Sequence, residues 1–244
     1  MNVPHESYRV LVADAATPVG TALIAYLADT EYVLRALVTD ADAEGRAHEA
    51  GADEVVHADL ANHHALDDVV ADVDALCCTA TDGGLGRVAG SLDGGRGLRT
   101  LIDAVDTRPY VVLHSTIGVG DSRRGMTLPR RVYNYRLLRA LDETERYVRE
   151  RGVPYTVLRT GATTDDARTH DVVTGEGGGE VSGRIGRADL AWLMTAALTT
   201  PEARNRTFEV ASADATTATD AVGFAWSGPE TGLVARRSGY SIPS

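Results

Sequence analysis

Short, uniformly apolar runs separated by helical stretches restrict the fold of this chain more than any other feature. Six such runs occur before residue 160, at positions 8–13, 32–39, 54–57, 73–80, 110–115 and 155–159. Because they are apolar throughout rather than alternating, they are typical of parallel strands covered on both faces. Strands that alternate with helices imply right-handed crossovers. The sequence therefore predicts an α/β domain with a doubly wound, mostly parallel sheet.

Local signals place the helices between these strands. Thr17 before Pro18 indicates a helix start, with an N-cap followed by proline at the first helical position. A long helix is predicted over residues 130–151, ended by Gly152. Beyond residue 160 we expect a glycine-rich loop or hairpin tip at 175–183, a helix at 187–198 and a last strand at 207–210. Residues 1–211 then form one domain with a small C-terminal portion, and residues 212–244 an irregular extension.

The charge pattern favours an acidic protein adapted to salt. The formal net charge is -11, and all 24 basic residues are arginine. Such an excess of carboxylates repels itself at low ionic strength and is screened at high salt. A GC-rich genome, which also favours Arg over Lys, is the alternative explanation. Either origin makes nucleic acid or anionic lipid a poor partner.

The remaining composition points to a cytoplasmic protein without a membrane span. No apolar run approaches the roughly 20 residues that cross a bilayer, and the first residues show no secretion signal. The adjacent Cys77 and Cys78 suit a buried central strand better than a disulfide framework. We expect no metal site, because His63 and His64 are neighbours on a predicted helix and do not face each other.

The turn after the first strand is the candidate ligand site. In a doubly wound sheet, ligands bind outside the carboxyl ends of the strands, next to the first one. Here that turn reads Val12-Ala13-Asp14-Ala15-Ala16-Thr17-Pro18-Val19-Gly20.

This turn and later blocks resemble the atypical short-chain dehydrogenase/reductases, specifically the NmrA-like NAD(P)-binding family. That family shows Gly-Ala-Thr-Gly-x-x-Gly after its first strand, of which this chain keeps only the third glycine, Gly20. The resemblance spans roughly residues 8–211 in family order. The other matching blocks are Arg35-Ala36-Leu37-Val38, Ala58-Asp59-Leu60, His114-Ser115-Thr116-Ile117-Gly118-Val119-Gly120, Gly152-Val153-Pro154-Tyr155-Thr156-Val157-Leu158-Arg159-Thr160-Gly161 and Ile185-Gly186-Arg187-Ala188-Asp189-Leu190-Ala191.

The resemblance implies a Rossmann-type NAD(P)-binding domain with a C-terminal substrate side. Ser115 ends a central strand and is the candidate catalytic residue, as a donor to a carbonyl or to nicotinamide; capping of the turn is its structural alternative. Arg159 would border the nicotinamide side, or serve as a buried structural arginine. The implied cofactor-binding residues are Asp14, Ala15, Thr17, Pro18, Val19, Gly20, Thr39, Asp40, Asp59, Leu60, Thr79, Ala80, Ser115 and Gly161.

Two departures from the family bear on chemistry. Asp14 and Thr17 stand where the first two glycines let backbone amides approach the diphosphate. A carboxylate beside a diphosphate costs about 3 kcal/mol at ~5 Å and an effective dielectric near 20. The wider superfamily also uses a Tyr-x-x-x-Lys pair, and this chain has no Lys. Tyr135 and Arg139 have that spacing, whereas alignment places the family's lysine at Leu141.

The expected function is hydride transfer between a nicotinamide cofactor and a small substrate that the sequence does not name. Thr39 and Asp40 lie where an acidic residue would favour NAD(H) and an arginine NADP(H), so they lean to NAD(H) unless Arg35 or Arg46 reaches over. The alternatives are a non-catalytic NAD(P) sensor that contacts a regulatory protein partner, and a degenerate scaffold without nucleotide. Monomer and homodimer both remain open.

Overall fold

The structure is a computed structural model that describes residues 8–38, 41–58, 66–79, 96–105, 108–216 and 224–227. Its centre is an eight-stranded sheet with the order β3-β2-β1-β4-β5-β6-β10-β8. All neighbouring strands are parallel except β8 and β10, which are antiparallel. These strands are β1 (Arg9–Ala13), β2 (Val33–Val38), β3 (Glu54–His57), β4 (Ala75–Cys78), β5 (Tyr110–Thr116), β6 (Tyr155–Thr160), β8 (Val172–Gly175) and β10 (Arg206–Ser212).

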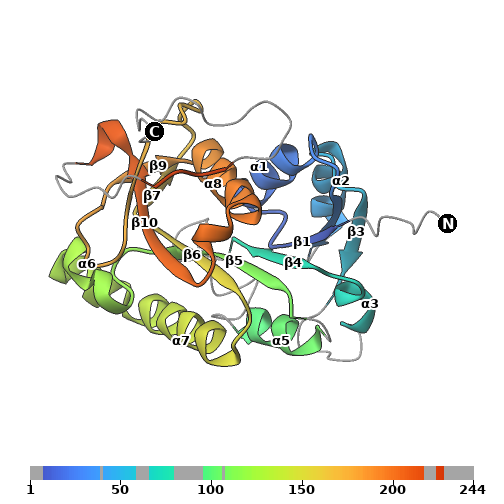
Figure 1. The fold of residues 1–244 in the computed structure, drawn as a ribbon, viewed down its shortest axis with the longest axis horizontal. Coiled ribbons are helices and arrows are strands. Elements are labelled where there is room, and N and C mark those ends of the chain that lie inside the picture. Colours follow the sequence, from blue (N-terminus) through green and yellow to red (C-terminus); the bar gives the residue numbers. More distant parts are fainter. Residues whose placement is uncertain are drawn as a thin grey trace.

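Helices cover both faces of this sheet, so the molecule has three layers (Figure 1). One face carries α1 (Pro18–Leu27), α2 (Ala41–Glu49) and α8 (Arg187–Thr199), which share one hydrophobic cluster. The other carries α3 (Asp67–Val70), α5 (Arg96–Ala104) and α7 (Tyr135–Arg151), which share a second cluster. The apolar strands face helices on both sides, which is why they do not alternate. The predicted fold class is confirmed.

The chain order reverses between β1 and β4, the usual ligand-binding position in such sheets. From β1 the chain proceeds outward to β2 and β3, then returns to β4, which pairs with the other side of β1. The carboxyl ends of β1 and β4 therefore lie side by side at one edge of the sheet. This topology positions the candidate site.

The long helix predicted over residues 130–151 is confirmed only from residue 135 on, because its first residues belong to a separate short helix. Helix α6 (Leu128–Tyr133) begins with proline in its first turn and ends at Asn134, whose N–H donates to the carbonyls of Arg130 and Val132. Helix α7 starts at Tyr135 and ends at Gly152, which has a φ of 71°. The ending at Gly152 is as expected, but the break shapes a pocket described below.

The C-terminal part contains strands and 3-10 helices that are too short to be predicted from the sequence pattern. A two-stranded parallel sheet pairs β7 (Ala162–Thr164) with β9 (Arg184–Gly186). Short 3-10 helices are η3 (Gly120–Gly125), η4 (Pro201–Ala203) and η5 (Ala213–Ala215). Phe224 and Trp226, within the predicted extension, are buried against Phe208 of β10, with ring centroids 4.7 and 5.0 Å from it.

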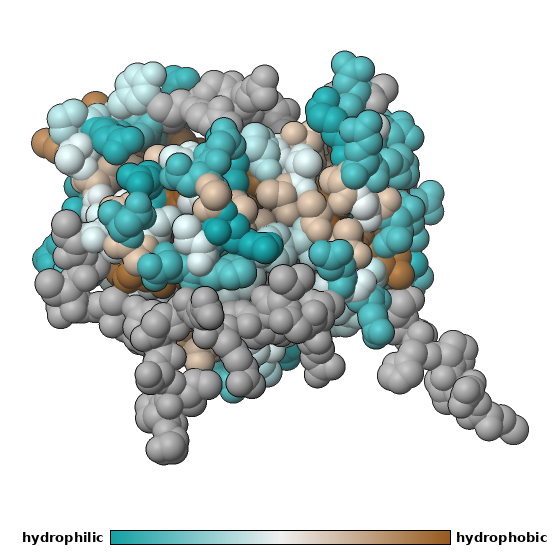
Figure 2. Space-filling model, turned by 90° about the horizontal axis from the view of Figure 1, so that it is seen from above, coloured by the Kyte–Doolittle hydropathy of each residue, from teal (hydrophilic) through white to brown (hydrophobic). Residues whose placement is uncertain are grey.

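The burial of the two cysteines and the hydrophilic surface agree with the amino-acid composition. Cys77 and Cys78 are fully buried free thiols on β4, as expected, and burial raises the pKa of Cys77 to about 12. Hydrophilic side chains cover much of the face in Figure 2, with apolar ones between them. Among the described helices, none is long and apolar enough to cross a membrane.

Candidate functional site

The turn from β1 to α1 keeps the backbone shape of a phosphate loop without its first glycine. Asp14 has a φ of 60°, in the left-handed region that glycine adopts most easily and that Asp tolerates better than most residues. Its carbonyl oxygen accepts from the Thr17 N–H at 3.0 Å, which closes the turn. The Asp14 side chain is buried. An aspartate thus occupies a position whose backbone conformation favours glycine.

Thr17 caps the helix that follows. Its Oγ1 accepts from the Gly20 N–H at 3.0 Å, and Pro18 is the first helical residue. The predicted N-cap is confirmed. One amide at the start of α1 is therefore engaged within the turn, by the side chain that replaces the second glycine.

Gly20 allows α1 to lie close to the turn. A Cβ on Gly20 would lie 2.4 Å from the Asp14 carbonyl oxygen and 3.0 Å from Thr17 Oγ1. Real Cβ atoms do not approach backbone that closely, so only glycine fits here without movement. This is the third-glycine role in dinucleotide folds, which is close packing of the helix on the first strand.

Two hydroxyl groups meet at the point where the strand order reverses. Thr17 Oγ1 lies 2.9 Å from Oγ1 of Thr79, the residue directly after β4. Thr79 Oγ1 also donates to the carbonyls of Ala13 and Asp14, at 3.4 and 3.3 Å. The structure thus brings together two predicted cofactor-binding residues that are 62 positions apart.

The turn keeps the dinucleotide cradle with two changes from the family's pattern. The left-handed residue, the start of α1 and the close approach at Gly20 preserve the cradle. One change is the buried Asp14 carboxylate, which would repel a diphosphate. The other is the Thr17 hydroxyl in place of bare backbone, and this hydroxyl donates to the Asp14 carbonyl at 2.9 Å. The helix dipole at the start of α1 favours an anion at this position.

The other predicted cofactor residues are placed as follows. Ala15 is buried and its N–H donates to the Leu37 carbonyl at 3.2 Å, Val19 lies in the core, and Pro18 is exposed. Gly161 is exposed between β6 and β7. Thr39, Asp40, Asp59, Leu60 and Ala80 lie outside the described residues, as do His63 and His64.

Ser115 belongs to a buried ionic network. Its hydroxyl donates to Glu145 Oε1 at 2.7 Å, and the whole side chain is buried. Arg159 donates to both oxygens of Glu145, at 3.0 and 2.7 Å, and also to Asp121. Desolvation opposes the charge of Arg159, but these two carboxylates outweigh it and raise its pKa above the usual value. Arg159 is thus a buried structural arginine, while donation from Ser115 to a ligand stays a prediction.

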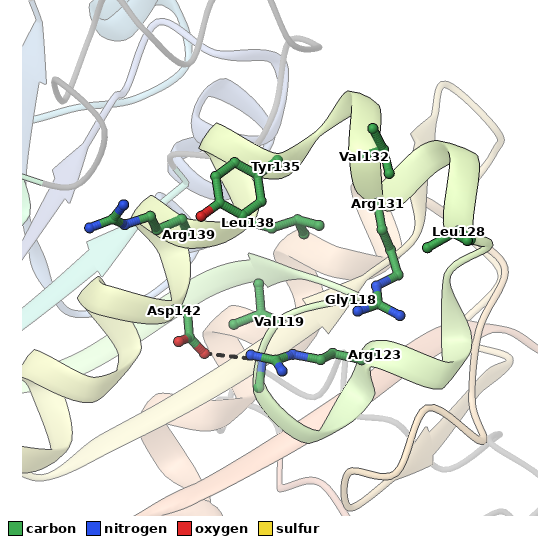
Figure 3. Close-up of a pocket in the computed structure, with 11 residues that line it drawn as sticks. Gly118, Val119, Arg123, Leu128, Arg131, Val132, Tyr135, Leu138, Arg139 and Asp142 are labelled. Carbon is green, nitrogen blue, oxygen red and sulfur yellow. Dashed lines mark hydrogen bonds between the residues drawn. The ribbon is translucent and has the colours of Figure 1, made fainter.

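A pocket of about 350 Å³ opens beyond the end of β5, beside this network (Figure 3). One wall comes from the segment after β5 and from α6, the other from the first turns of α7. Its lining residues are Gly118, Val119, Gly120, Arg123, Leu128, Arg131, Val132, Tyr135, Leu138, Arg139 and Asp142. A volume of this size is within the range of small-molecule sites. Except for the Tyr135–Arg139 spacing, sequence reasoning missed these residues.

Tyr135 and Arg139 both face this pocket, one helical turn apart on α7. Hydrogen bonding to the Glu143 carboxylate, and secondarily to the Tyr135 phenol, raises the pKa of Arg139. Leu141, at the family's lysine position, is instead buried against Val119 and Leu138. Arg139 therefore places a cation beside Tyr135, two residues before Leu141, where the alignment puts the family's lysine.

Comparison with known proteins agrees with this geometry. A family model described as NAD(P)H-binding matches residues 15–201. No curated protein sequence matches the chain.

Solved structures show the same fold at low sequence identity. The anaerobillin reductase ChuY from Escherichia coli O157:H7 is 19% identical, with a TM-score of 0.71 over 84% of this chain and 98% of that one. The oxidoreductase ylbE from Lactococcus lactis is 16% identical, with a TM-score of 0.69 over 86% and 92%. A short-chain dehydrogenase/reductase from Veillonella parvula in complex with NADP is 15% identical, with a TM-score of 0.69 over 89% and 99%.

The family model confirms the predicted cofactor class, and the solved structures share the fold that the resemblance to atypical short-chain dehydrogenase/reductases implies, while the NmrA-like subgroup stays a prediction. The matched residues include Gly20, both hydroxyls at the strand reversal and the pocket on α7. The chain belongs to the NAD(P)H-binding family.

Proposed function

We propose that this protein is an NAD(P)H-dependent oxidoreductase that transfers a hydride between the cofactor and a small substrate. The observation that carries the proposal is that two features, the start of α1 and an open pocket, lie at the same edge of the sheet. Helix α1 begins where the strand order reverses, and an open pocket lies two strands away at the end of β5. A dinucleotide laid along this edge spans that distance in related folds.

The residues of the turn would hold the diphosphate. Thr17 and Thr79 place two hydroxyl groups at this turn, and the start of α1 offers a favourable dipole. The bound nicotinamide supplies the hydride. Gly161 and the segment after it would cover the substrate side, and Ser115 lies on the neighbouring strand end.

Tyr135 is the group in the pocket that can donate a proton to a reduced substrate. Its side chain is 62% exposed, so its hydroxyl is accessible to a ligand in the pocket. The Arg139 guanidinium lines the same pocket one helical turn further along α7 and places a positive charge beside this site. Arginine stays protonated, so it stabilises charge without relaying the proton.

A second candidate function is nicotinamide sensing without turnover, through contact with a regulatory partner. It is favoured by Thr17, which already caps the Gly20 amide, and by Leu141, which replaces the family's lysine. Both changes weaken parts of the catalytic pattern and leave the fold intact.

Four finer assignments belong to the same proposal. We propose NAD(H) over NADP(H) from Asp40, a cytoplasmic location, adaptation to high salt from the net charge of -11, and a monomer or homodimer. A regulatory partner would apply only to the sensing function.

The test is a titration of NADH and NADPH followed by nicotinamide fluorescence in 0.2 and 2 M KCl. Turnover is then measured as NADH oxidation with menadione or flavin mononucleotide. Tyr135→Phe should slow oxidation at least tenfold with unchanged NADH affinity, since positioned proton donors contribute roughly 10²–10⁴-fold. Tyr133→Phe is the matched control, because Tyr133 is 77% exposed and does not line the pocket.

The outcomes separate the candidates. NADH binding with oxidation supports the enzyme, and binding without oxidation favours the sensor. Absence of binding by the wild type, with binding restored in Asp14→Gly, favours the degenerate scaffold. Equal slowing by the two tyrosine variants would contradict the role given to Tyr135.

A further inference from the structure

The segment that builds the pocket has a charge opposite to that of the whole protein. Residues 120–139 contain six of the 24 arginines and one acid, Asp121, while the chain as a whole has a net charge of -11. A cluster of positive charges in a protein with a negative net charge produces a local positive potential. This segment therefore attracts anions to a molecule that otherwise repels them.

Three of these arginines line the pocket: Arg123 on η3, Arg131 on α6 and Arg139 on α7 (Figure 3). Arg139 is paired with Glu143. Within the described part of the chain, neither Arg123 nor Arg131 forms an ion pair, unlike the buried Arg159. Two guanidinium groups at the pocket therefore remain available to a ligand.

The acid in the pocket offsets only part of this charge. Asp142 Oδ1 accepts from the Gly120 N–H at 3.1 Å, so this carboxylate also holds the backbone of the loop. The lining therefore has three arginines against one aspartate.

Apart from the Tyr135 hydroxyl and the backbone at Gly118 and Gly120, the rest of the lining is apolar. Val119 and Leu138 are buried at its base, and Leu128 and Val132 are 68% and 69% exposed at its rim. Exposed aliphatic side chains beside an open cavity gain free energy when a ligand covers them. The site thus combines apolar contact area with positively charged donors suited to a carboxylate.

We infer that the pocket selects a small organic acid: an aromatic or aliphatic body carrying a carboxylate, with Arg123 and Arg131 as the residues that recognise the charge. The inference rests on the proposed function for its role as the substrate site, but binding of the acid does not require turnover. Neutral molecules of the same shape would lack the contacts that the two guanidinium groups provide.

The test uses 2-naphthoate as the probe and 2-naphthamide as its uncharged analogue, with affinities measured by calorimetry in 0.1 M KCl. The pocket variant is Arg123→Gln/Arg131→Gln. The control is Arg130→Gln/Arg136→Gln, which removes the same charge from exposed positions of the same segment that do not line the pocket. Thermal unfolding of both variants confirms folding.

The wild type should bind 2-naphthoate more tightly than 2-naphthamide. The pocket variant should bind 2-naphthoate roughly tenfold more weakly, since charged hydrogen bonds stabilise by about 1.5–3 kcal/mol and the site is partly exposed to solvent. The control variant and all affinities for 2-naphthamide should change less than about twofold, as expected of charges that do not contact the ligand.

Several results would overturn the inference. They are failure of the wild type to bind 2-naphthoate, equal affinity for the two probes, and equal weakening by the pocket and control variants. A loss of NADH affinity in the pocket variant would assign the arginines to the cofactor instead. If 2-naphthoate binds as expected but NADH neither binds nor is oxidised, the proposed function fails and the anion site stands.

Discussion

Replacing Asp14 tests how far the altered turn restricts cofactor binding. Asp14 is buried with a φ of 60°, and its carbonyl closes the turn before α1. Glycine at this position removes backbone strain of about 1 kcal/mol. It also adds chain entropy to the unfolded state, which costs about 0.5–1 kcal/mol. The two effects nearly cancel, so the change in backbone conformation alone should leave the unfolding temperature of Asp14→Gly close to that of the wild type.

The effect on affinity should be much larger than the effect on stability. A carboxylate at ~5 Å from one phosphate charge, with an effective dielectric near 20, costs about 3 kcal/mol. Removing it should tighten NADH binding by roughly a hundredfold. Burial of the side chain limits screening by salt, so most of this gain should persist at 0.2 M KCl.

Asp14→Asn is the matched variant, because asparagine keeps the shape and tolerates the same backbone conformation. Nicotinamide fluorescence in 0.2 M KCl measures affinity, and a thermal melt without cofactor measures stability. If the charge acts as reasoned, Asn and Gly variants should gain affinity alike. A gain in the glycine variant alone would assign the effect to backbone geometry, and no gain in either would refute the electrostatic reasoning.

Three further predictions concern stability, each measured by urea unfolding. Gly20→Ala should lower the free energy of unfolding by about 1–3 kcal/mol, because its Cβ would overlap the backbone of the turn. Gly45→Ala, with nothing within 4 Å, should raise it by about 1 kcal/mol, and equal effects would contradict the packing argument. Glu145→Ala should cost about 3–5 kcal/mol, because it leaves a buried guanidinium without its main partner. Glu150→Ala, in an exposed pair, should cost under about 1 kcal/mol, and a similar loss in both would refute this contrast. Burial lowers the pKa of His170, so the unfolded state takes up a proton that the folded state resists, and stability should fall as pH drops from about 7 to 5. His170→Asn, which suits its φ of 57°, should weaken that fall, and identical pH dependence in the variant would oppose the assignment.

The sequence predicted the parallel sheet and the helix start at Thr17 because both depend on local rules. Continuous apolar runs, a threonine cap and a following proline have the same meaning in any context. The short strands β7 and β9 were missed because they contain three residues each and little apolar character. Their existence depends on pairing with each other in space.

The pocket could not be predicted for a related reason. The helical pattern continues through Asn134, so the break that separates α6 from α7 gave no strong signal. The Tyr135–Arg139 spacing is visible in the sequence, but its meaning depends on which side of α7 faces the cavity. The same holds for Ser115, whose partner Glu145 lies 30 residues away.

The glycine-rich loop after β8 is tied to the sheet by one carboxylate. Glu209, buried on β10, accepts from the Gly179 N–H at 2.7 Å and the Val181 N–H at 3.2 Å. The loop in turn touches the end of η3, since a Cβ on Gly179 would lie 2.4 Å from the Gly125 nitrogen. The wall that carries Arg123 is therefore held in place from β10, the strand next to the edge of the sheet. The rest of that wall is the six-residue helix α6, so the pocket joins a wall held by the sheet to a short helix that has no buried residues.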